Sequence, residues 1–307
     1  MWVVISLTAG LLQTARNGLA RSLSGVLPAS LLSWSRFAFN LPFSTGLVIL
    51  VSVLAADGAP RLSARFLLLC LIGGVGQLLG NVALITSFRL ATFAQAIVVH
   101  KTEVALAAVT GFLFFSEAPS ALGWLGIVVS ALGVAMIGRA SAVARQPGTA
   151  TDWSEVLAAN RGTGLALAAA ALLVVAGFGI QRATVELQAI NPGSGNFSSA
   201  ATTLFHVTWM EVAILTGWIL LREPSAFRAV PAHLPRLSAI GLTSFAGSLG
   251  WFWAFSLSFV AFVKAVGQIE SVASVLLAIY LWKEQKTRDQ LPGIALTVAG
   301  IFLIVLS

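Results

Sequence analysis

Hydrophobic runs of about 20 residues recur along the whole chain, separated by short polar, glycine-containing or proline-containing breaks. Within a run such as LGIVVSALGVAMIG the apolar residues occupy consecutive positions and do not alternate with polar ones. About 20 such residues allow an α-helix to cross the hydrocarbon layer of a membrane, whereas strands of a membrane barrel alternate. The pattern therefore predicts membrane-spanning helices.

Ten spans result when the runs are divided at proline, glycine and charge clusters. They cover residues 2–20, 29–55, 66–88, 92–115, 119–138, 162–181, 199–221, 236–256, 259–282 and 291–306. Most connections between spans are short, so we expect neighbours in sequence to be antiparallel neighbours in space. The exception is a polar linker near the middle of the chain, at 139–161.

The second half of the chain repeats features of the first half at a distance of 167 residues, without a gap. In this register Glu103 aligns with Glu270, and Glu117 aligns with Glu284. Four pairs of glycines align as well: Gly74 with Gly241, Gly80 with Gly247, Gly126 with Gly293, and Gly133 with Gly300. Two glutamates in register within such an apolar chain indicate an internal duplication.

This duplication predicts the fold class and the division of the chain. Residues 1–138 form one five-helix repeat and 162–307 the second, joined by the linker 139–161. Because five is odd, the second repeat enters the membrane in the opposite orientation. We therefore expect an all-α integral membrane protein with ten transmembrane helices, arranged as two inverted five-helix repeats around a central cavity.

Composition and charge agree with this class and give it an orientation. Of 307 residues, 58% are hydrophobic and 9% are charged, compared with roughly 25% charged residues in soluble domains. Eleven of the 18 Lys and Arg lie in odd-numbered loops, when Arg236 at the start of the eighth span is counted with the preceding loop, and three lie in even-numbered ones. By the positive-inside rule the odd loops face the cytoplasm, which places both termini outside an inner (plasma) membrane. The single cysteine, Cys70, excludes an intrachain disulfide and a cysteine metal cluster.

Charged side chains at membrane depth are costly, and they usually pair or face a watery cavity. Glu103, Glu211 and Glu270 are such groups, and we expect them to be structural struts or proton-coupling sites. Lys101 and Lys264 are not related by the repeat, as expected for contacts with one asymmetric substrate carrying a carboxylate or phosphate. The alternative is that both lysines form internal ion pairs with these glutamates.

Further polar and aromatic residues within the spans complete the candidate substrate-binding set: Gln13, Asn17, Gln77, Asn81, Gln95, His100, His206, Trp209, Trp251 and Gln268. His100 shares a helical face with Glu103, which suits either a proton relay or a neutral, hydrogen-bonded histidine, and His206 poses the same choice. Trp251 and Phe255 fall on one face and predict an aromatic wall for an amphipathic molecule, with lipid contact as the alternative.

Two other sets of residues are expected to serve the architecture. Glu117 and Glu284 end their spans just before a reverse turn, where a carboxylate can accept hydrogen bonds from the N–H groups that begin the next helix. The third span carries Gly73, Gly74, Gly76 and Gly80, which predicts close packing against a neighbouring helix.

Two inverted halves, each closing with a glutamate, a Gly-Ile step and a further glycine, resemble the drug/metabolite transporter superfamily. The nearest type is the EamA-type exporters, in particular bacterial exporters of aromatic and other neutral amino acids. The matching residues are Glu103, Glu117, Gly126 and Gly133, with their mates Glu270, Glu284, Gly293 and Gly300. The resemblance implies a basket of helices around a central cavity, alternating access and no bound cofactor.

The sequence therefore favours a secondary transporter that exports small amphipathic metabolites, above all neutral or aromatic amino acids. An antiporter of phosphorylated sugars or other organic anions is the alternative, although relatives of that kind use basic residues in the fourth and ninth helices and only Lys101 and Lys264 match here. An intramembrane enzyme is a distant third. We expect the partners to be a small-molecule substrate and the lipid bilayer, with no nucleic acid, and a monomer is compatible with the sequence.

Overall fold

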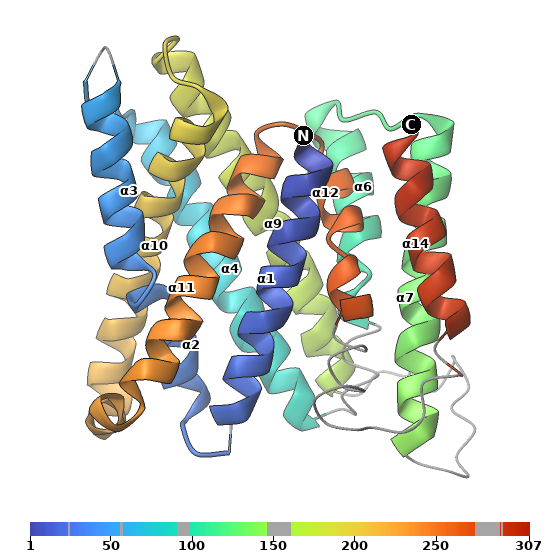
Figure 1. Ribbon diagram of the computed structural model, residues 1–307, viewed down its shortest axis with the longest axis horizontal. Helices are drawn as coiled ribbons and strands as arrows, with labels where there is room; N and C mark the ends of the chain where they lie inside the picture. Colours follow the sequence, from blue (N-terminus) through green and yellow to red (C-terminus); the bar gives the residue numbers. More distant parts are fainter. Residues whose placement is uncertain (24, 56–57, 91–98, 146–160, 274–288, 290) are drawn as a thin grey trace. The chain divides into compact units, whose positions relative to one another are not determined.

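The computed structural model describes residues 1–23, 25–55, 58–90, 99–145, 161–273, 289 and 291–307 (Figure 1). Throughout these ranges the secondary structure is helical and contains no strand. Four segments in them are long and apolar enough to cross a membrane by length and composition: Ser30–Leu54, Ala64–Leu84, Arg161–Ile190 and Asn196–Arg222. This is consistent with an integral membrane protein, and the number of spans stays a prediction.

The chain divides into two compact units. Unit 1 comprises Met1–Leu78 and Val175–Ser258, and unit 2 comprises Leu79–Val174 and Phe259–Ser307. Each unit therefore combines segments from both halves of the sequence. Helices α4 (Ala64–Leu90) and α9 (Arg161–Ile190) each contribute one part to each unit.

Unit 1 is built from α1 (Trp2–Leu23), α2 (Ala29–Ala38), α3 (Leu41–Leu54), α10 (Asn196–Arg222), the 3₁₀ helix η1 (Pro224–Ala229) and α11 (Val230–Phe255), with the adjoining parts of α4 and α9. Helix α1 packs along α11, and both α2 and α3 pack on α10 (Figure 1). The predicted second span is divided into α2 and α3 at Phe39–Asn40. Pro42 lies at the start of α3, where its missing N–H does no harm, whereas inside a continuous helix it would disturb the preceding turn.

Unit 2 is built from α6 (Glu103–Phe115), α7 (Ala121–Arg145), α12 (Val260–Val266) and α14 (Leu291–Val305), with the remaining parts of α4 and α9. Helix α7 packs along α14, and α12 packs on α6. The predicted fifth span ends at 138 and the linker begins at 139, but α7 continues to Arg145. Five of the seven added residues, RASAVAR, are alanine or arginine, which are strong helix formers.

The contacts between α7 and α14 are related by the 167-residue register. An added Cβ at Gly126 would lie 2.9 Å from the carbonyl oxygen of Gly300, and one at Gly293 would lie 2.7 Å from that of Gly133. The register aligns Gly126 with Gly293 and Gly133 with Gly300, so the contact of Gly126 with Gly300 corresponds to the contact of Gly293 with Gly133. These contacts show that α7 and α14 run antiparallel, as the predicted inverted repeat requires, and the inverted repeat of the whole chain stays a prediction.

The predicted fourth and ninth spans both contain a turn. Residues 99–100 are helical, 101–102 form a turn, and α6 begins at Glu103. Helix α12 ends at Val266, 267–268 form a turn, and residues 269–273 are helical again. Both turns are closed by backbone hydrogen bonds between residues three apart. The N–H of Val104 donates to the carbonyl oxygen of Lys101, and the N–H of Glu270 donates to that of Gly267. In the 167-residue register the two turns fall within one residue of each other.

The sequence predicted two continuous helices at these positions. One physical reason for the second turn is Gly267, because a glycine in a helix costs about 1 kcal/mol relative to alanine. A stretch with 3₁₀-type bonds inside a helix often marks a functional hinge, which makes the residues around both turns candidates for function.

Candidate functional site

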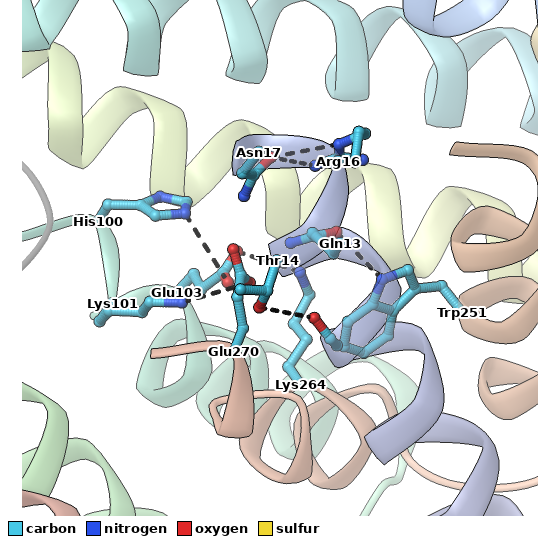
Figure 2. Close-up of polar contacts among 11 residues, drawn as sticks. Gln13, Thr14, Arg16, Asn17, His100, Lys101, Glu103, Trp251, Lys264 and Glu270 are labelled. Atoms are coloured by element: carbon cyan, nitrogen blue, oxygen red, sulfur yellow. Dashed lines mark hydrogen bonds and ion pairs between the residues drawn. The ribbon is translucent and has the colours of Figure 1, made fainter. Parts of the chain in front are cut away.

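Four charged side chains of unit 2 meet beside the two turns, and we call them the charged cluster: Lys101, Glu103, Lys264 and Glu270 (Figure 2). The Lys264 Nζ lies 3.2 Å from the Glu103 Oε2, and the Lys101 Nζ lies 3.8 Å from the Glu270 Oε2. Each glutamate thus pairs with a lysine from the opposite half of the sequence. The formal charges of the cluster sum to zero.

The two ion pairs differ in tightness. Lys264 donates a hydrogen bond to Glu103, whereas the 3.8 Å separation of Lys101 and Glu270 is too long for one. All four side chains are largely buried, with exposed fractions between 11% and 16%. Because charges shielded from water need a partner, the pairing explains how this polar group is tolerated within apolar helices.

Two buried polar side chains in the segments that carry the cluster lack partners for some of their atoms. The Nδ1 of His100 and both the Nε2 and Oε1 of Gln268 have no hydrogen-bond partner among the described residues. His100 is 8% exposed and Gln268 is 1% exposed, and the Nε2 of His100 lies 4.0 Å from the Glu103 Oε1. Most buried polar atoms in proteins are hydrogen-bonded, so these three atoms are candidates for contacts with a ligand.

Glu117 follows the end of α6, where Ser116 adopts a left-handed conformation with φ of 56°. Its Oε2 accepts a hydrogen bond of 3.2 Å from the backbone N–H of Val260, in the first turn of α12. The sequence predicted a cap on the next helix in the chain, α7. At the start of α7 the hydroxyl of Ser120 accepts the N–H of Gly123, and the bond between Glu117 and Val260 joins two segments that are distant in sequence.

Several predicted binding residues belong to unit 1, where they take part in packing between α1 and α11. The indole N–H of Trp251 donates a hydrogen bond of 3.1 Å to the Gln13 Oε1 (Figure 2). The Trp251 ring stacks on Phe255 with centroids 6.1 Å apart, as their predicted common face requires. Asn17 accepts two hydrogen bonds from the guanidinium of Arg16 on the same helix.

Helix α10 carries the predicted residues His206, Trp209 and Glu211. The Nδ1 of His206 lies 2.9 Å from the carbonyl oxygen of Thr202, the geometry of a hydrogen-bonded histidine. Glu211 is 1% exposed, and its Oε1 has no hydrogen-bond partner in the described part of the chain. Trp209 is 56% exposed, a surface position that favours lipid contact over substrate contact.

The remaining predicted residues are only partly informative. Gln77 and Asn81 are half-buried and lie one turn apart on α4. Gln95 and Glu284 lie outside the described residues. Besides the Gln13–Trp251 pair of unit 1, the structure brings together five members of the predicted sets in unit 2: His100, Lys101, Glu103, Lys264 and Glu270.

Comparison with known proteins identifies the fold and no family. One solved structure, described only as "Crystal structure of protein", aligns with 99% of this chain and 97% of its own, with a TM-score of 0.72 and 18% sequence identity. At this identity the likeness shows a shared fold alone. No protein-family model matches the chain, and no curated protein matches it.

Proposed function

We propose that the protein is a secondary transporter that carries small amphipathic metabolites, above all neutral or aromatic amino acids, out of the cell by alternating access. The observation that carries this proposal is the charged cluster, in which two lysines balance two glutamates. It lies beside the turns at 101–102 and 267–268. Transporters commonly form substrate sites where membrane helices are interrupted, because the freed backbone and nearby polar groups can face the substrate. The resemblance to EamA-type exporters supports the same function.

The charge balance of the cluster favours a substrate with no net charge. Lys101 and Lys264 each have a glutamate within 4 Å, so neither brings an uncompensated positive charge to the site. Recognition of a phosphate ester usually uses a surplus of bases, often arginines that bind two oxygens at once. A phosphorylated sugar or another organic anion is therefore the weaker candidate, although it remains the alternative.

Uptake into liposomes that contain the purified full-length protein tests the proposal. The vesicles are offered labelled leucine, phenylalanine or a hexose phosphate, each with and without a proton gradient. We expect saturable uptake of the amino acids and little uptake of the phosphate. Saturable uptake of the hexose phosphate alone would replace the proposal with the anion antiporter.

A matched control comes from an ion pair of similar length outside the charged cluster. The Nε of Arg65 lies 3.6 Å from the Glu186 Oε2 in unit 1, and the Arg65 side chain is 77% exposed. Because exposed ion pairs contribute little to stability, Arg65→Met should transport as the wild type does. It shows what the loss of an ion pair away from the charged cluster does to uptake.

A further inference from the structure

We infer that the looser of the two ion pairs, Lys101 with Glu270, opens to receive an amino-acid zwitterion. The substrate carboxylate binds beside Lys101, and the substrate ammonium binds beside Glu270. This inference rests on the proposed function and names the substrate groups that the site recognises. The tighter pair, Lys264 with Glu103, holds the two segments together while the looser pair exchanges partners.

The distances distinguish the two pairs. Charge-assisted hydrogen bonds are usually 2.7 to 2.9 Å long, and the Lys264–Glu103 contact at 3.2 Å retains a hydrogen bond. The Lys101–Glu270 contact at 3.8 Å has no hydrogen bond to break between its two charges. A ligand that separates Lys101 from Glu270 therefore loses less than one that separates the other pair.

A zwitterion matches this pair in charge. When it binds, one buried ion pair becomes two, and the cluster stays neutral. A ligand with only an ammonium gives Lys101 no negative charge in exchange for Glu270, and a ligand with only a carboxylate gives Glu270 no positive charge in exchange for Lys101, so either ligand adds a net charge to the buried cluster. An uncompensated buried charge is strongly unfavourable, so the site should discriminate against both singly charged ligands.

Two residues close in sequence to Lys101 and Glu270 have buried polar atoms without a hydrogen-bond partner among the described residues. His100 precedes Lys101 in the chain and has an unpartnered Nδ1. Gln268 lies two residues before Glu270, is 1% exposed, and has a donor and an acceptor without partners. An ammonium offers three donors and a carboxylate offers several acceptor positions, so the two ends of a zwitterion suit these atoms.

Competition binding on the full-length wild-type protein in nanodiscs provides the first test. Labelled leucine is displaced by unlabelled leucine, by 3-methylbutan-1-amine, which lacks its carboxylate, and by 4-methylpentanoate, which lacks its ammonium group. We expect each analogue to compete about 10- to 100-fold less well than leucine, the loss typical of a missing contact to a charged group. Competition within threefold of leucine by either analogue would overturn the inference.

Two variants test which residue binds which group. In Lys101→Met the amine should compete as well as leucine does, because the carboxylate no longer gains a partner. In Glu270→Gln the pentanoate should compete as well as leucine does. Arg65→Met should keep the wild-type preference. Unchanged wild-type ratios in both cluster variants would overturn the assignment, and the wild-type competition remains decisive if either variant does not fold.

Failure of this inference can be separated from failure of the proposed function. If leucine and phenylalanine are transported but the singly charged analogues compete equally well, the protein is an amino-acid transporter and the zwitterion site is wrong. If no amino acid is bound or transported while a hexose phosphate is, the proposed function and the inference both fail.

Discussion

The close approach of α4 and α9 within unit 1 makes Gly179→Ala an informative perturbation. An added Cβ at Gly179 would lie 2.8 Å from the backbone nitrogen of Gly73 and 2.9 Å from its Cα. These distances are roughly 0.7 Å shorter than the approximately 3.5 Å of a favourable contact between carbon atoms. Because the opposing atoms belong to the backbone, the helices must move apart, and overpacking of this kind costs about 1–3 kcal/mol.

Gly217→Ala in α10 is the matched control, because nothing lies within 4 Å of an added Cβ there. Both variants gain the higher helix propensity of alanine, worth up to about 1 kcal/mol, so the difference between them isolates the packing cost. We expect Gly179→Ala to be less stable than Gly217→Ala by about 1–3 kcal/mol.

The only cysteine of the chain supplies the assay. Cys70 is fully buried and lies on α4, one turn before Gly73. A thiol-reactive dye should label it only when this part of unit 1 opens, so labelling during heating reports the stability of the α4–α9 contact. Labelling of Gly179→Ala at the same temperature as Gly217→Ala, or a higher one, would refute the packing argument.

Three further substitutions test other contacts, each by thermal unfolding in detergent against the wild type. Lys264→Met leaves Glu103 buried without its nearest cation and should lower the free energy of unfolding by about 3–5 kcal/mol. The double variant Lys264→Met/Glu103→Gln should regain most of that stability. Equal losses of stability in the single and the double variant would contradict the pairing. Glu117→Ala removes a cap from α12 and should cost about 1 kcal/mol, and an unchanged midpoint would argue against the bond. Trp251→Phe removes the hydrogen bond to Gln13 and should lower the free energy of unfolding by about 0.6 kcal/mol. In a protein that already carries Gln13→Leu, the same Trp251→Phe substitution should cause no such loss.

Much of the helical architecture could be predicted from the length of the apolar runs, because continuous apolar runs of about 20 residues are typical of membrane-spanning helices. The 167-residue register, found from glutamates and glycines, also describes contacts that the sequence does not display directly. Gly126 meets Gly300 as Gly133 meets Gly293. The common face of Trp251 and Phe255 likewise follows from helical geometry.

The parts that could not be predicted depend on contacts between distant segments. The sequence left two alternatives for Lys101 and Lys264, and no local pattern indicates that each lysine pairs with a glutamate from the other half of the chain. The same holds for the hydrogen bond from the Val260 N–H to Glu117, which joins residues 143 positions apart in the sequence. The two turns beside the charged cluster were missed because their residues, apart from Gly267, are compatible with a continuous helix.

Counterflow in liposomes tests most directly whether the protein moves amino acids by alternating access. Vesicles loaded with unlabelled leucine are diluted into a trace of labelled leucine, and the internal label is followed over time. The account predicts a transient accumulation of label above its external concentration, which requires a saturable carrier that exchanges substrate and is absent from vesicles without protein. Entry of label that is unaffected by internal leucine and rises in proportion to external leucine would indicate a pore and contradict the account.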